Sequence, residues 1–254
     1  MNGGFRLLFS RAVRIKARFL LIFAAALLFI LGFRFAAARY EERHIATLSW
    51  SVTGKLIVID PGHGGEDPGA LGTTGVHEKD IVLEVAKKLA DILRQSGAGV
   101  ALTRESDRDL SDPDARNLYT AKLQDLNRRV AIANDRKADL FISVHVNSFP
   151  DTREDGAQTF SQPGSQESRR LAVAIQYELN RFLANPGREA KQVDYFACRM
   201  TKMPSAIVEI GFISNPREER LMLDPVYQSK TAWAIYAGIV RYFAQSAAAS
   251  AKTR

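Results

Sequence analysis

The chain has 254 residues, of which 46% are hydrophobic and 25% are charged, which is typical of globular proteins rather than of disordered or collagen-like chains. Its single cysteine, Cys198, excludes an intrachain disulfide framework and a cysteine-based zinc cluster, and we interpret it as a small core residue. The net charge is +7, but seven of the cations and none of the acids lie in residues 1–39. Because charges balance over the rest of the chain, we expect no nucleic-acid partner.

The basic excess surrounds an apolar segment near the N-terminus. Fifteen consecutive apolar or glycine residues cover 19–33, and the run continues beyond Arg34 to Ala38. Five cations precede it, which predicts a cytoplasmic N-terminus and an extracytoplasmic body. Residues 19–38 are either an uncleaved transmembrane anchor behind a basic cytoplasmic tail, 1–18, or a signal peptide cleaved after its small terminal residues. We favour the anchor because the run is at the long limit for a signal peptide.

The remaining chain is predicted to hold a tether (39–54, which includes a solvated His44), one catalytic domain (55–243) and a disordered tail (244–254). In chain order, the domain is predicted to contain a strand at Leu56–Ile59, a helix at Asp80–Gln95, a strand at Gly99–Thr103, a helix at Leu123–Asn134, a strand at Leu140–Val144, a helix marked by Leu171 to Phe182, a strand at Ala206–Ile210, a helix starting at Asn215-Pro216 and a last helix through Ala232 and Phe243. Strands that alternate with helices predict a single α/β domain with a mostly parallel, twisted sheet and helices on both faces.

Polar residues that a core would not select follow or interrupt three of these strands. His63 follows the first strand in a glycine-rich segment, His145 follows the third, and Glu209 lies inside the fourth. The carboxyl ends of parallel strands share one edge of a sheet, so these residues are expected to converge there. Glu78 precedes the first helix of the domain. Two imidazoles and a carboxylate suit a catalytic Zn²⁺, and a further carboxylate would serve as general base.

Each of these residues also has a structural interpretation. A histidine at the end of a strand is more often hydrogen-bonded within the fold than a ligand, and Glu209 belongs either to a buried ion pair or to a site. From the residues alone, Glu78 is no better a ligand than Glu66 or Asp67, and His77 is a rival ligand.

Six segments together resemble one family. They are Lys55–Gly65 (KLIVIDPGHGG), Glu78–Asp80 (EKD), Thr103–Asp107 (TRESD), Leu126–Asn134 (LNRRVAIAN), Ala138–Ser148 (ADLFISVHVNS) and Ala206–Asn215 (AIVEIGFISN). In this order, over nearly the whole domain, they resemble the zinc-dependent N-acetylmuramoyl-L-alanine amidases. Six motifs in sequence are far more specific than any single one.

The resemblance implies the roles of four residues. His63, Glu78 and His145 match the zinc ligands of the family, and Glu209 matches its catalytic glutamate. The resemblance also favours Glu78 over His77 as the third ligand. The implied reaction hydrolyses the amide between the lactyl group of N-acetylmuramic acid and L-alanine of the stem peptide.

Two further polar residues at the same sheet edge, Asp60 and Asn147, are expected either to orient His63 and His145 or to make turn and loop hydrogen bonds.

Within the family, the chain is most similar to the membrane-anchored, germination-specific amidases of endospore formers. The N-terminal apolar segment, the absence of wall-binding repeats and the short connection after His145 support this similarity. It implies spore cortex maturation through muramic lactam formation, which germination requires. The implied partners are peptidoglycan, the membrane and an activating protein. The stretch Asp107–Leu123 is longer than the common pattern and bears on substrate selection.

Two other functions remain open. A zinc peptidase that cuts between amino acids of the stem peptide would use the same ligands. A catalytically silent wall-binding scaffold would need none of them, and the presence of all four site residues argues against it.

Overall fold

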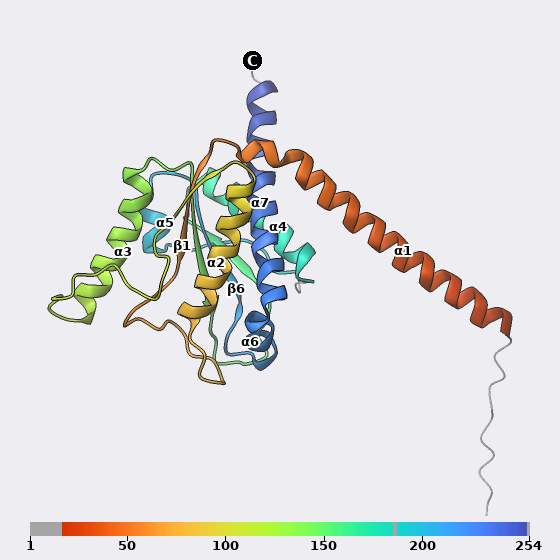
Figure 1. Cartoon of the computed structure of the whole chain (residues 1–254), viewed down its shortest axis with the longest axis horizontal. Helices are drawn as coiled ribbons and strands as arrows, with labels where there is room; N and C mark the ends of the chain where they lie inside the picture. Colours follow the sequence, from red (N-terminus) through yellow and green to blue (C-terminus); the bar gives the residue numbers. More distant parts are fainter. Residues whose placement is uncertain (1–16, 185–186, 253–254) are drawn as a thin grey trace, which may run out of the picture. The chain divides into compact units, whose positions relative to one another are not determined.

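The computed structural model describes residues 17–184 and 187–252, and the chain divides into two compact units, residues 1–46 and 47–254 (Figure 1). The strands are β1 (Leu56–Pro61), β2 (Gly99–Leu102), β3 (Leu140–Asn147), β4 (Gln158–Ser161), β5 (Lys191–Gln192) and β6 (Ser205–Phe212). The helices are α1 (Ala17–Leu48), the 3-10 helix η1 (Ser49–Val52), α2 (Glu78–Gln95), α3 (Leu118–Asp135), α4 (Gln166–Phe182), α5 (Phe196–Met200), α6 (Pro216–Leu223) and α7 (Pro225–Lys252).

The described part of the first unit, residues 17–46, is helical and belongs to α1. Large apolar side chains between Phe19 and Phe33 are exposed along this helix. Within residues 17–184 and 187–252, none of the helices combines the length and the apolar character that crossing a membrane requires. The anchor at 19–38 stays a prediction, and the predicted basic tail falls mainly on residues 1–16, which lie outside the described residues. The side chain of His44 is also outside the described part.

The segment predicted as a tether, 39–54, is mostly helical. Helix α1 continues through it to Leu48, and η1 follows directly. This stretch contains alanine, arginine and glutamate, which are good helix formers, so it is helical although its apolar residues show no helical periodicity.

The six strands form one sheet in the order β2-β1-β3-β6-β4-β5. The pairs β1–β2, β1–β3, β3–β6 and β4–β5 are parallel, whereas β4 runs antiparallel to β6. The prediction of a single α/β domain is confirmed, and the sheet is mixed. Strands β4 and β5 were missed because they are short and polar, so neither gives a hydrophobic run.

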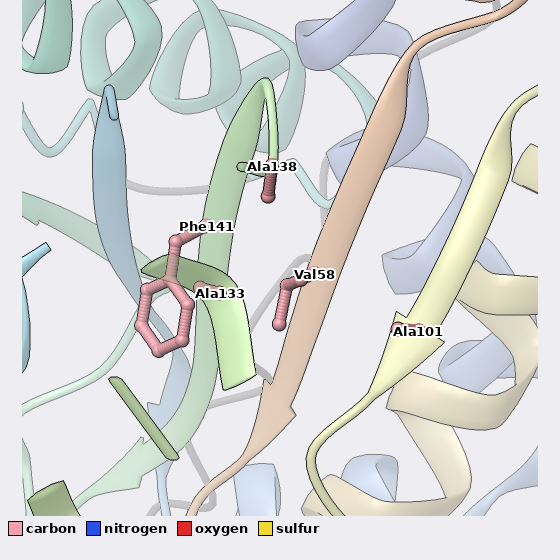
Figure 2. Packing of buried hydrophobic residues seen from close by; sticks show 5 residues of the cluster. All are labelled: Val58, Ala101, Ala133, Ala138 and Phe141. Carbon is pink, nitrogen blue, oxygen red and sulfur yellow. The ribbon is translucent and has the colours of Figure 1, made fainter. Parts of the chain in front are cut away.

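Helices cover both faces of the sheet. Figure 1 shows α3 and α5 on one side and α2, α4 and α7 on the other. Beneath α3, a cluster of buried residues joins the helix to β1, β2 and β3 (Figure 2); its members are Val58, Ala101, Ala133, Ala138 and Phe141. The small alanines let the helix lie close to the sheet. Because both faces are covered, polar side chains of the central strands are accessible only at the strand ends.

The ends of several helices follow their sequence signals. Helix α2 stops before Gly97, which has a positive φ of 84°. Asn215 caps α6 by accepting hydrogen bonds from the backbone N–H groups of Arg217 and Glu218, with Pro216 in the first turn.

The segment 244–254, predicted as a disordered tail, is helical in its described part, where α7 continues to Lys252. Alanine is frequent in this segment and has the highest intrinsic helix propensity of the amino acids. Residues 253–254 lie outside the described part.

Candidate metal centre

The site forms where β1, β3 and β6 lie next to one another. β1 ends at Pro61, and the chain then passes Gly62 and His63 against the side chain of His145 in β3. A Cβ atom added to Gly62 would lie 2.2 Å from His145 Cε1, so only glycine allows this approach. The register between β3 and β6 shifts from His145, opposite Glu209, to Asn147, opposite Phe212, so β6 has one extra residue at this point. His145 therefore lies within its strand rather than after it.

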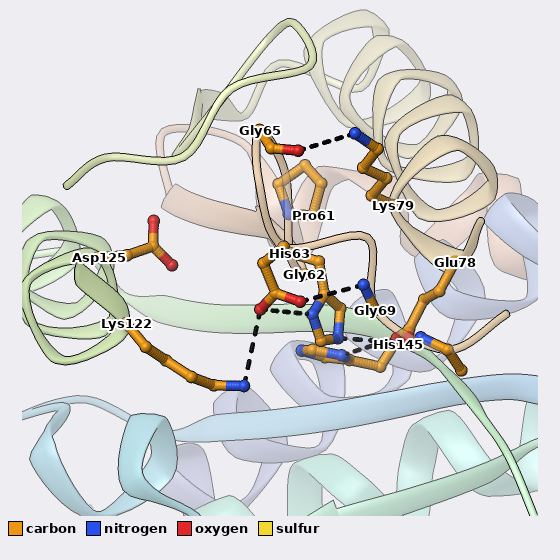
Figure 3. Close-up of polar contacts among 12 residues, drawn as sticks. Pro61, Gly62, His63, Gly65, Gly69, Glu78, Lys79, Lys122, Asp125 and His145 are labelled. Atoms are coloured by element: carbon orange, nitrogen blue, oxygen red, sulfur yellow. Dashed lines mark hydrogen bonds and ion pairs between the residues drawn. The ribbon is translucent and has the colours of Figure 1, made fainter. Parts of the chain in front are cut away.

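His63, Glu78 and His145 come together as three potential ligands. Their ligand atoms all lie within 4.8 Å of one another. His63 Nε2 is 3.3 Å from Glu78 Oε2, and His145 Nδ1 is 3.0 Å from Glu78 Oε1 (Figure 3). The two imidazole rings are edge-to-face, with centroids 5.0 Å apart. The backbone N–H groups of Ala70 and Val146 donate to the two oxygens of Glu78, which fixes this carboxylate at the first turn of α2.

Glu209 lies beside this group without belonging to it. It is the register partner of His145 across the β3–β6 pair, and it lies outside the cluster of ligand atoms. Its Oε2 atom is buried and has no hydrogen-bond partner among the described residues. Because an unpaired buried oxygen is costly in free energy, a polar group from outside the chain is expected to satisfy it.

The electrostatics of the site favour a bound cation. Burial tends to lower the pKa of His63, but hydrogen bonds and charges of Asp67 and Glu78 outweigh it and raise that pKa to about 9. Burial also tends to lower the pKa of His145, but Glu78 and Glu209 outweigh it and raise that pKa. The pKa of Glu78 lies well below its usual range, because the two histidines outweigh the effect of its burial. Two imidazoles and a carboxylate in a negative potential fit a divalent zinc ion.

Glu209 has the opposite shift. Burial raises its pKa to about 7, and the charge of Glu78 adds to the rise while the histidines oppose it. The pKa values of these two carboxylates are thus shifted in opposite directions.

The contacts of Asp60 and Asn147 distinguish between the two roles expected for them. The Asp60 carboxylate accepts hydrogen bonds from Thr103, Ser143 and Arg129, and Asn147 accepts one from the backbone N–H of Ser148. Neither orients a histidine directly, so turn and loop hydrogen bonding describes them better.

Asp67 takes the orienting position instead. Its Oδ2 atom lies 2.9 Å from His63 Nδ1 and 3.6 Å from Lys122 Nζ. From the residues alone, Asp67 was only a rival ligand. The glycines around it, which permit the loop to turn back on His63, were the available signal.

The remaining rivals lie away from the ligand group. His77 precedes α2 and contacts Asp80 at 3.9 Å, and Glu66 is exposed. Cys198 is buried against Phe160 and Ile207, and burial raises the pKa of its thiol to about 11. This supports its interpretation as a core residue.

A cavity of about 230 Å³ reaches two of the three potential ligands. Its lining includes His63, His145, Lys122, Tyr195 and the inner part of α3. A second hollow of about 240 Å³ shares Asp67 and Lys122 with it and extends along the start of α3. The segment Asp107–Leu123 contributes to this second hollow, so it lies on the rim of the site.

The comparison with known proteins agrees with this geometry. The family described as N-acetylmuramoyl-L-alanine amidase matches residues 57–241. The chain belongs to this amidase family. It is 41% identical over 224 residues to a germination-specific N-acetylmuramoyl-L-alanine amidase of Bacillus subtilis, covering 85% of this chain and 94% of that protein.

Solved structures of amidases share the fold. The CwlD amidase of Clostridioides difficile, in complex with the GerS lipoprotein, superposes with a TM-score of 0.72 at 39% identity, over 74% of this chain and 98% of that one. Another N-acetylmuramoyl-L-alanine amidase from Clostridium difficile gives a TM-score of 0.67 at 29% identity, over 75% and 97%. The prediction that the chain is a peptidoglycan amidase is confirmed.

Proposed function

We propose that the amidase is zinc-dependent, with His63, Glu78 and His145 as ligands and Glu209 as general base. The observation that carries this proposal is the convergence of three ligand atoms within 4.8 Å beside a separate, buried carboxylate. A zinc ion held there would polarise the scissile carbonyl and lower the pKa of an attacking water.

The residues of the chain then have defined tasks. Glu209 accepts the proton of the attacking water at its unpaired Oε2 and returns it to the nitrogen of the leaving L-alanine. Asp67 holds Nδ1 of His63, which directs Nε2 towards the ligand group. The lactyl amide would lie in the cavity that is lined by His63 and His145.

The test is digestion of purified peptidoglycan by the full-length protein, with and without a chelator. New free amines that belong to L-alanine, lost on chelation and restored by zinc, support the proposal. Free amines on other stem residues would identify the zinc peptidase instead, and no cleavage by zinc-loaded protein would favour the scaffold.

We also propose that the substrate is the spore cortex and that the product is needed for muramic lactam formation and germination. The similarity to the germination-specific amidase of Bacillus subtilis supports this role. Mass spectrometry of cortex muropeptides from wild-type and deletion strains tests it, since muramic lactam should disappear from the deletion strain. A change confined to vegetative wall would contradict it.

The protein is further proposed to work outside the cytoplasm, held at the membrane by residues 19–38 and helped by a protein partner. The cations before the apolar run and the exposed apolar side chains of α1 support membrane attachment, and the CwlD–GerS complex supports a partner. Protease added to protoplasts should remove the body and spare the N-terminal tail, whereas an intact body would contradict this orientation. A mature N-terminus at Arg39 would identify a cleaved signal.

A further inference from the structure

Two buried arginines hold the backbone of the loop that carries His63. Arg104, after β2, and Arg129, in α3, have exposed fractions of 1% and 2%. Arg129 donates to the carbonyl oxygens of Pro61 at 2.7 Å and His63 at 2.6 Å. Arg104 donates to those of Pro61 at 3.0 Å and Gly62 at 2.8 Å. Three consecutive carbonyls of the ligand loop therefore all accept hydrogen bonds from guanidinium groups.

The loop needs this support because its conformation is strained. His63 has a φ of 60°, in the left-handed region, which costs a residue with a side chain about 1–2 kcal/mol. Carbonyls that point into the protein also require donors, since each unpaired buried group costs about 1–3 kcal/mol. A guanidinium group supplies five donors in one plane and can satisfy several such carbonyls at once.

A further arginine hydrogen bond and one backbone hydrogen bond connect the three ligand-bearing segments. Arg104 Nη2 also donates to the carbonyl of Lys79 at 2.8 Å, directly after Glu78 in α2. The N–H of Gly62 donates to the carbonyl of Val144 at 3.0 Å, directly before His145. The loop is thus tied to the helix of one ligand and to the strand of another.

Arg129 is itself held by carboxylates. Its Nη1 lies 2.8 Å from Asp60 Oδ1, and its Nε lies 2.7 Å from Asp125 Oδ2. These two acids balance the buried charge and fix the plane of the guanidinium group. None of these contacts reaches the imidazole ring of a ligand, so any effect on the site is transmitted through the backbone.

We propose that Arg104 and Arg129 are positioning residues whose hydrogen bonds to the Pro61–His63 carbonyls set the zinc affinity of the site. The inference rests on the proposed zinc ligands and deepens that proposal. Its consequence is that the site is arranged before the metal binds. A lysine at either position keeps the charge but has three donors on a flexible stem, so it leaves loop carbonyls unpaired.

The test measures the zinc dissociation constant of the full-length protein by competition with a chelator, for Arg104→Lys and Arg129→Lys. Each variant should bind zinc roughly 10–100-fold more weakly than wild type, the usual effect of removing partners that hold metal ligands. At saturating zinc, cleavage should return towards the wild-type rate. The matched control is Arg241→Lys, because Arg241 pairs with the fully buried Glu178 on α4, away from the site. It should change the melting temperature without changing zinc affinity.

Folded Arg104→Lys and Arg129→Lys proteins with wild-type zinc affinity would overturn the inference. If either fails to fold, Asp125→Asn removes the charge that orients Arg129 while keeping the packing, and the same comparison applies. Wild-type protein that binds zinc but cleaves nothing would contradict the proposed function alone, since the affinity comparison needs no turnover. Wild-type protein that binds no zinc would overturn both.

Discussion

The two sides of the candidate metal centre differ in how their polar atoms are satisfied. On the side formed by residues 61–79, both oxygens of Glu78 accept hydrogen bonds from backbone N–H groups, and the loop carbonyls are bonded to arginines. On the β6 side, Glu209 keeps a buried oxygen with no partner among the described residues. A satisfied carboxylate with a lowered pKa suits a fixed ligand, whereas an unsatisfied one with a raised pKa suits proton transfer. Under the proposed assignment, the side formed by residues 61–79 holds the fixed ligand Glu78, and the β6 side carries the residue that transfers the proton, Glu209.

The largest effect on zinc content is expected from removing a histidine ligand, either His63 in the loop after β1 or His145 in β3. His63→Ala or His145→Ala should lower bound zinc well below one equivalent and abolish cleavage, because two remaining ligands do not hold the metal. Metal analysis after dialysis measures this. His77→Ala is the matched control, since His77 lies outside the ligand group, and it should stay fully loaded. Fully loaded His63→Ala or His145→Ala protein would show that the ligand assignment is wrong.

The next effect separates Glu209 from the ligands. Glu209→Gln keeps the size of the side chain but removes the proton acceptor, so cleavage should fall by roughly 100-fold or more with zinc content unchanged. Zinc stoichiometry, melting temperature and turnover are measured on one preparation.

Glu219→Gln provides the contrast for a structural carboxylate. Glu219 accepts hydrogen bonds from the backbone N–H groups of Thr73 and Thr74, so its loss should lower the melting temperature more than turnover. A stable, zinc-loaded Glu209→Gln protein that cleaves at nearly the wild-type rate would remove Glu209 from the mechanism.

A smaller effect tests the close contact between the loop and β3. Gly62→Ala places a Cβ against the imidazole of His145, and overpacking of this kind costs about 1–3 kcal/mol. Zinc affinity should fall by about tenfold as the ring is displaced, measured by chelator competition. Gly99→Ala is the control, because its Cβ would meet Leu56 at an ordinary 3.5 Å. Equal affinities in the two variants would contradict the contact.

The smallest effect concerns pH and the ion pair beneath the loop. Burial opposes the lowering of the Asp60 pKa from 3.8, but Arg129 and the hydroxyls of Thr103 and Ser143 outweigh it. As the pH falls, Asp60 therefore binds a proton in the unfolded chain before it does so in the folded protein. The Asp60–Arg129 pair stabilises the fold above the pKa that Asp60 has in the unfolded chain, and this stabilisation is lost as the pH falls through the lower pKa of Asp60 in the folded protein. Each tenfold difference in proton affinity between the folded and unfolded states corresponds to about 1.4 kcal/mol of unfolding free energy.

Urea unfolding from pH 6 down to acid measures this contribution in wild type and in Asp60→Asn. The difference in unfolding free energy between the two proteins should narrow as the pH falls below about 4. A difference that stays constant with pH would show that Asp60 has the same pKa in the folded and the unfolded protein, so that its pair with Arg129 adds no pH-dependent stability.

The sequence by itself determined the order of the main elements and the identity of the converging residues. Apolar runs and helical spacing placed β1, β3, β6 and α2, because burial on both faces leaves a clear hydrophobic pattern. The polar residues at the strand ends followed from the shared edge of a parallel sheet. The choice of Glu78 over His77 came from family resemblance, since periodicity alone offered no reason for it.

Only the tertiary structure decided which neighbours hold these residues. The antiparallel β4 gave no periodic signal, and the contacts of Asp67 with His63 and of Arg129 with the loop carbonyls join positions that chain order does not relate. In a sequence, Arg104 and Arg129 resemble ordinary surface residues, and their proposed positioning role arises only because the fold buries them next to the loop carbonyls that they hydrogen-bond. Hydrophobic pattern is a local property of the chain, whereas hydrogen-bond satisfaction in a buried site is a property of the packed fold.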